Sequence, residues 1–149
     1  MNATLTSEIN RSIGYEIHDG FHKSLRVLFI DDEPGLVAVA EMLLTHLGHD
    51  PVGCTDPVEA LVCARREEFD LVITDFTMPG LTGMELRRAL RAYRPALPVI
   101  LSTAYGLLME GATAESLGFQ GYLPKPYGLK ELAKVVQDLA VEQGLAEAL

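Results

Sequence analysis

The sequence predicts an α/β fold: a doubly wound, five-stranded parallel sheet in the order 2-1-3-4-5, with helices on both of its faces. Short apolar runs alternate along the chain with helix-like segments, which is typical of a parallel sheet with crossover helices. Polar residues follow four of these runs directly. Right-handed crossovers leave few orders for five strand-helix units, and this order suits them.

Length and charge limit the classes of function. A chain of 149 residues suits one domain with one core, and a net charge of -9 argues against nucleic-acid binding by this chain alone. No apolar stretch approaches the ~18 residues of a membrane-spanning helix, and the N-terminus lacks a signal-peptide pattern. We therefore expect a cytoplasmic protein without membrane contact, in which Cys54 and Cys63 are ordinary thiols.

Residues 1–24 form an N-terminal extension before the first strong strand. Apolar residues recur there at every fourth position: Leu5, Ile9, Ile13, Ile17 and Phe21. This spacing predicts an added helix that packs on the domain or on a second copy, which would make a homodimer. Two glycines weaken the helix, so a tail or linker with accidental spacing stays open.

The first strand is predicted at residues 25–30, and acidic residues follow it at Asp31, Asp32 and Glu33. Pro34 suits the first turn of the following helix, which we expect Asp32 to cap. Favourable charge at the start of a helix explains one acid well and three acids poorly. The acidic triplet therefore points to a second role.

The third apolar run, residues 69–74, is followed directly by Asp75 and then by the turn-forming residues Pro79 and Gly80. This pattern predicts a buried strand that enters a turn. Ligands bind at the C-terminal ends of strands in open parallel sheets, which is where Asp75 lies. On this stretch alone, capping of the turn is an equally good role for Asp75.

The remaining elements complete the alternation. A weak second strand at residues 49–54 precedes a helix that runs from Asp56 to Glu67, and a third helix begins near Thr82. Leucines and Tyr93 form the inner face of that third helix, and its arginines form a solvated outer face.

Two further strands end in polar residues. Residues 97–101 precede Thr103, and residues 119–123 precede Lys125. A poor helix is expected between them at residues 107–117, because Gly111 and Thr113 are weak helix formers. The last helix is predicted at residues 129–143, and it is amphipathic.

Asp31, Asp32 and Asp75 would share one small crevice if neighbouring strands brought them together. Without a cation, such carboxylates repel one another. Mg²⁺ prefers oxygen ligands, and it commonly takes one or two carboxylates plus a phosphate oxygen. An ionised aspartate can also be a nucleophile that forms an acyl phosphate. Lys125 and the hydroxyl of Thr103 could then each bind one phosphoryl oxygen.

Residues 25–143 resemble the receiver domain of bacterial two-component response regulators, both single-domain regulators and receivers of hybrid histidine kinases. Four motifs in order support the resemblance: Asp31-Asp32, Asp75-Phe76-Thr77-Met78-Pro79-Gly80, Thr103-Ala104 and Lys125-Pro126. The resemblance implies a flavodoxin-like receiver domain over residues 25–143, with a C-terminal tail at 144–149.

The resemblance also implies roles for the acidic residues. Asp75 is then the phosphoacceptor. Asp32, Asp75 and the backbone carbonyl of Thr77 would hold Mg²⁺, and Asp31 would act on the metal partly through water.

A switch and a cis peptide are implied as well. Thr103 and Lys125 would bind the phosphoryl group, and the hydroxyl of Thr103 would move toward it while Tyr122 turns inward. The bond between Lys125 and Pro126 would be cis, which proline makes accessible.

The function expected from this resemblance is phosphorelay signalling and not enzymatic turnover. The partners are a sensor histidine kinase or a histidine phosphotransfer protein, and a downstream protein that binds a face made by residues 107–117, the last strand and the last helix. We expect no output domain after residue 143, and the chain is either a stand-alone regulator or a fragment of a hybrid kinase.

Two alternatives are weaker. A degenerate receiver that serves only as a binding module should lack at least one key residue, and none is missing. A phosphatase with an aspartate nucleophile usually carries a second aspartate two residues after the first, where this chain has Thr77.

Overall fold

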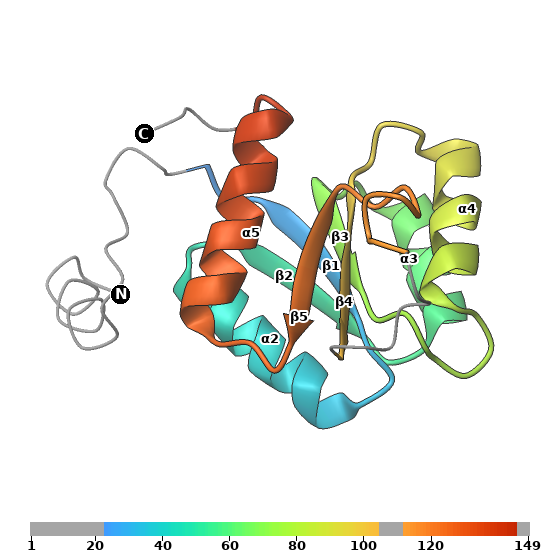
Figure 1. Cartoon of the computed structure of the whole chain (residues 1–149), viewed down its shortest axis with the longest axis horizontal. Helices are drawn as coiled ribbons and strands as arrows, with labels where there is room; N and C mark the ends of the chain where they lie inside the picture. The colour runs from blue at the N-terminus through green and yellow to red at the C-terminus, as the bar shows by residue number, and fades with distance from the viewer. Residues whose placement is uncertain (1–22, 105–111, 146–149) are drawn as a thin grey trace, which may run out of the picture.

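The computed structural model describes residues 23–104 and 112–145, which form one sheet between two layers of helices (Figure 1). The elements in order are β1 (Arg26–Ile30), α2 (Pro34–His46), β2 (Asp50–Cys54), α3 (Pro57–Arg66), β3 (Leu71–Thr74), α4 (Gly83–Tyr93), β4 (Val99–Ala104), β5 (Gly121–Lys125) and α5 (Leu129–Glu142). None of the helices in these ranges combines the length and hydropathy needed to cross a bilayer.

The five strands pair in parallel in the order β2-β1-β3-β4-β5, which confirms the predicted topology. The C-terminal ends of all five strands therefore lie at one edge of the sheet, and their N-terminal ends lie at the opposite edge. Ile30 of β1 pairs with Thr74 of β3, so the residues that follow them leave the sheet side by side.

The core consists of two apolar layers, one on each face of the sheet. Val27 and Phe29 of β1 pack beneath α2 and α5, whereas Leu28 and Ile30 pack beneath α3 and α4. Because side chains alternate across a strand, a central strand buries side chains on both faces of the sheet and is therefore mostly apolar. This requirement explains the continuous apolar runs that made β1 and β3 recognisable in the sequence.

The N-terminal caps of α4 and α2 can be compared with the caps predicted from the sequence. Thr82 begins α4 with a capping box, in which its Oγ1 accepts the Glu85 N–H at 3.1 Å and its own N–H donates to Glu85 Oε1 at 3.2 Å. The expected cap of α2 by Asp32 is wrong. The N-cap residue is Glu33, and its N–H donates to Asp31 Oδ1 at 3.0 Å.

The connection between β4 and β5 differs from the expected helix. Its described part, residues 112–118, forms turns, while residues 105–111 lie outside the described range. Thr113 and Ser116 exchange side chain to backbone hydrogen bonds of 2.8 and 3.0 Å, and Gly118 has a φ of 90°. The reciprocal pattern is like that at the start of α4, but here the turns end at Gly118 and no α-helix follows in the described part of the connection.

Arg87 does not lie on a solvated face of α4. It is 8% exposed, its Nε donates to the Gly118 carbonyl at 2.7 Å, and its guanidinium lies 5.8 Å from the centre of the Phe119 ring. The expectation fails because the turn before β5 covers this side of the helix. The predicted N-terminal helix falls in residues 1–22, outside the described part of the chain.

A buried histidine makes stability depend on pH. His49 Nδ1 accepts the Leu25 N–H at 3.1 Å, and burial lowers the pKa of His49 below its ordinary value of 6.5, against the weaker opposing effect of Asp70. The folded protein then binds fewer protons than the unfolded chain near that pH, so its stability rises with pH and is lost as pH falls through about 6.5.

We therefore expect the free energy of unfolding to fall more steeply between about pH 7 and pH 5 in the natural protein than in His49→Gln. Urea unfolding at several pH values measures this difference. Equal slopes for His49→Gln and the natural protein would contradict the assignment.

Candidate functional site

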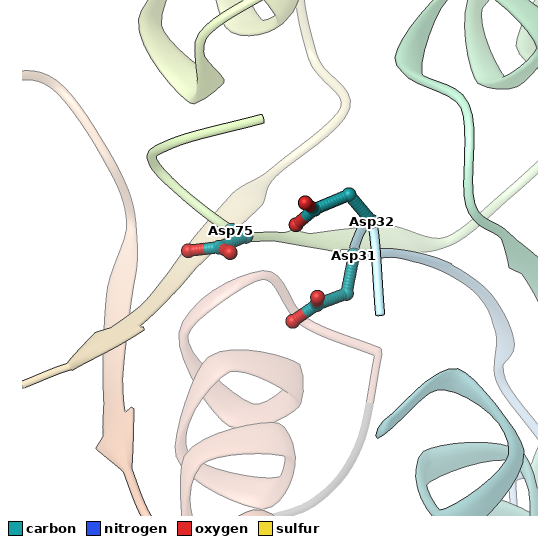
Figure 2. Close-up of side chains that lie close together, drawn as sticks. All are labelled: Asp31, Asp32 and Asp75. Atoms are coloured by element: carbon teal, nitrogen blue, oxygen red, sulfur yellow. The ribbon is translucent and has the colours of Figure 1, made fainter. Parts of the chain in front are cut away.

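Three carboxylates meet at the C-terminal edge of the sheet, as the sequence predicted (Figure 2). Asp31 and Asp32 follow β1, Asp75 follows β3, and each offers an oxygen within 4.8 Å of the others. The parallel pairing of β1 and β3 brings them together, because the Asp75 N–H continues the ladder by donating to the Ile30 carbonyl at 3.0 Å.

The three carboxylates differ in exposure. Asp31 is 1% exposed, Asp75 is half-buried, and Asp32 is exposed. Beside Asp32 lies an open cleft of about 490 Å³, which is lined by Asp32, Pro34, Thr55, Asp56, Pro57, Pro79 and Gly80. A reactant can therefore approach the site from the side of Asp32, while Asp31 forms its floor.

Lys125, the last residue of β5, reaches across to the acidic cluster. Its Nζ lies 2.6 Å from Asp31 Oδ2 and 3.2 Å from Asp75 Oδ2. Burial opposes the charge of this ammonium, but the hydrogen bond and charge of Asp31, followed by the charge of Asp75, outweigh burial and raise the pKa of Lys125. The lysine thus stays protonated and holds two of the carboxylates.

The donor set fits a divalent cation. Three carboxylates against one ammonium leave the cluster formally negative, and all of the potential ligands are hard oxygen atoms. Mg²⁺ binds such sites through few protein ligands and keeps several waters. The three carboxylates therefore fit a hydrated Mg²⁺ ion.

The loop after β3 is shaped by a close approach of two backbone segments. Asp75 Oδ1 accepts the Phe76 N–H at 2.7 Å, and the Gly83 N–H donates to the Phe76 carbonyl at 2.7 Å. A Cβ atom at position 83 would lie 2.5 Å from the Asp75 carbonyl oxygen, so only glycine fits there. Thr77 lies in the exposed part of this loop.

Thr103 and Tyr122 occupy neighbouring strands on one face of the sheet. Leu101 pairs with Tyr122, and Thr103 lies two residues further along β4, on the same face as Leu101. Thr103 is fully buried, and its Oγ1 has no hydrogen-bond partner among the described residues. A buried hydroxyl without a partner costs about 1–3 kcal/mol, which an added acceptor would recover. Tyr122 is half-buried and packs against the α3 and α4 layer.

The peptide bond between Lys125 and Pro126 is cis, as expected.

Two residues around the site were not predicted from the sequence. Gly83 has no motif of its own, and only the backbone approach to Asp75 reveals its role. Tyr127 follows the cis proline, and burial together with the charge of Asp31 raises its pKa to about 12. Its hydroxyl therefore stays neutral beside the acidic cluster.

A family model described as the response regulator receiver domain matches residues 27–137. The chain is 34% identical over 122 residues to the transcriptional regulatory protein GlrR of Escherichia coli, covering 82% of this chain and 27% of GlrR. It is 33% identical over 116 residues to the sensor protein GacS of Pseudomonas syringae, covering 74% of this chain and 13% of GacS. It therefore spans only a small part of these curated relatives.

Solved structures show the same similarity. The structure of the response regulator protein TrrA from Thermotoga maritima, in complex with Mg²⁺–BeF, is 29% identical in sequence with a TM-score of 0.69. The match covers 77% of this chain and 98% of that chain.

The geometry predicts separate effects for two adjacent acids. Asp32→Ala should weaken Mg²⁺ binding at least about tenfold with the fold intact, because it removes a ligand and also relieves repulsion in the cluster. Glu33→Gln is the matched control, since Glu33 is exposed and outside the triad. Titration calorimetry with MgCl₂ measures both variants. Equal affinities for Asp32→Ala and the natural protein would exclude Asp32 as a ligand.

Proposed function

Because the chain belongs to the response regulator receiver domain family, we propose that it accepts a phosphoryl group on Asp75 from the phosphohistidine of a kinase or phosphotransfer protein. A receiver domain implies a histidine kinase partner, and it is a signalling phosphoacceptor module and not a conventional enzyme. The observation that carries this proposal is the contact of Lys125 with both Asp31 and Asp75 at the open edge of the sheet.

Asp75 is suited to act as the nucleophile. Its Oδ1 is held by the Phe76 N–H and its Oδ2 by Lys125, so the carboxylate is fixed before the phosphodonor arrives. A carboxylate oxygen of Asp75 forms a bond to phosphorus while the phosphorus–nitrogen bond of the donor breaks. The electron pair of that bond stays on the imidazole nitrogen, and the product is an acyl phosphate.

The other groups supply positive charge and positioning. Lys125 moves its hydrogen bond from the Asp75 carboxylate to a phosphoryl oxygen, while its bond to Asp31 keeps the ammonium in place. Asp32, Asp75 and the carbonyl of Thr77 would hold Mg²⁺ directly, and Asp31 would act partly through water. When bound, Mg²⁺ neutralises negative charge on the phosphoryl oxygens.

Readout begins at the buried Thr103 hydroxyl. A phosphoryl oxygen on Asp75 gives this donor an acceptor that it lacks among the described residues, and the gain favours the conformation in which they meet. Tyr122 then turns further into the space on the same face of the sheet. We propose that a downstream protein binds the face formed by residues 107–117, β5 and α5.

Incubation with acetyl phosphate and Mg²⁺ should add one phosphoryl group to the natural protein and none to Asp75→Asn, which lacks the nucleophilic carboxylate. Intact mass spectrometry measures the addition. Asp138→Asn, at an exposed position of α5, should be labelled like the natural protein. Labelling of Asp75→Asn at the natural level would show that another residue is the acceptor.

Thr103→Ala should remain phosphorylatable but lose the coupling to Tyr122, because it lacks the hydroxyl that senses the phosphoryl oxygen. Amide NMR of residues 112–127 with and without beryllofluoride, a phosphoryl mimic, measures this coupling. Thr45→Ala, exposed on α2, is the control. Equal shifts on addition of the mimic in Thr103→Ala and the natural protein would exclude this route of readout.

A further inference from the structure

A groove lies at the edge of the sheet opposite to the acidic cluster. It has a volume of about 530 Å³, and its lining includes Phe69, Tyr93, Arg94, Leu97, Pro98 and Leu145. Phe69 precedes β3, Leu97 and Pro98 precede β4, and Leu145 follows α5, so this edge groove collects the N-terminal ends of two strands and the end of the last helix. Neither the acidic cluster nor the Thr103 switch uses it.

The edge groove has apolar walls, and its charged lining residues are Arg94 and Asp70, of which Asp70 already accepts the Arg26 N–H. Phe69, Tyr93, Leu97 and Leu145 are each only half-buried. Arg94 is half-buried at the end of α4, and no carboxylate of the described residues forms an ion pair with it. Arg91 is exposed one turn earlier on the same helix. The groove therefore suits a segment that is apolar and acidic.

We propose that the N-terminal extension fills the edge groove of its own chain, with Ile17 and Phe21 against the apolar walls and Asp19 facing Arg94. The described chain enters the fold at this groove. The Arg26 N–H donates to Asp70 Oδ2 at 2.7 Å, and the Arg26 guanidinium lies 5.1 Å from the centre of the Phe69 ring. Both of these partners line the groove.

The short length of chain between Phe21 and β1 favours the N-terminal extension as the segment that fills the groove. Phe21 is five residues before Arg26, and five extended residues span at most about 17 Å. The start of β1 and the C-terminal end of α5 both lie on the upper side of the molecule in Figure 1. A short connection therefore suffices to bring Phe21 to the groove.

The charge of the extension also matches. Residues 1–22 carry Glu8, Glu16 and Asp19 against Arg11, whereas α4 carries three arginines and one glutamate and is followed by Arg94. The exposed apolar residues Val39 and Met42 of α2 offer another apolar surface. However, α2 contains Glu41 and no lysine or arginine, so it would not attract an acidic segment.

Amide NMR of the full chain tests the apolar part. Ile17→Asp and Phe21→Asp should each shift the amides of residues 69–70, 93–97 and 143–145, to the same extent at all protein concentrations. Tyr15→Asp, off the four-residue stripe, should leave these amides unchanged. The assignment would be overturned if the variants shifted the amides of Val39 and Met42 instead, or if they shifted no amides. Shifts that vanish on dilution would also overturn it, because they would indicate binding to a second copy of the chain.

A charge exchange tests the polar part. Asp19→Arg and Arg94→Glu should each lower the thermal midpoint, and the double variant should recover most of the combined loss because it restores an opposite-charge pair. Additive losses would contradict this pairing.

Removal of residues 146–149 should not shift the groove amides, and a shift there would assign the groove to the C-terminal tail. Phosphorylation by acetyl phosphate should be unchanged in the Ile17 and Phe21 variants, so a failure here is distinct from a failure of the acyl phosphate chemistry.

Discussion

The two ion pairs of Lys125 with Asp31 and Asp75 are the interaction on which the site depends. They join the end of β5 to the ends of β1 and β3, across the intervening strand β4. A parallel sheet gathers strand ends at one edge, but it also gathers like charges there when those ends are acidic. The lysine makes the cluster tolerable in a folded protein while leaving it negative enough for a divalent cation.

The same interaction links chemistry to conformational change. In the proposed mechanism, Lys125 would exchange its contact with Asp75 for a phosphoryl oxygen, and the Thr103 hydroxyl would gain an acceptor. Contacts of this kind would be made in only one of two states, and only differential contacts can shift a conformational equilibrium. The turn before β5, held by the buried Arg87, lies between Thr103 and the last strand along the chain, so it can respond to such a shift.

The fold and the acidic cluster were predictable because they depend on patterns local in sequence. Central strands buried on both faces must be continuous apolar runs, and a parallel order then places Asp31 near Asp75. Arg87 and Gly83 were not predictable, because their environments come from Gly118 and Asp75 in distant segments. The site roles of Thr77 and Tyr122 still rest on the resemblance and on proximity.

The central claim is that Asp75 is the phosphoacceptor, and identifying the modified residue tests it most directly. This test is needed because oxygens of three carboxylates lie within 4.8 Å of one another. Borohydride reduces an acyl phosphate to an alcohol, so the phosphorylated protein should yield homoserine in place of Asp75 when its peptides are analysed by mass spectrometry. Asp31 and Asp32 should remain aspartate. Homoserine at either of those positions, or at none of the three in a protein shown to carry the phosphoryl group, would contradict the account.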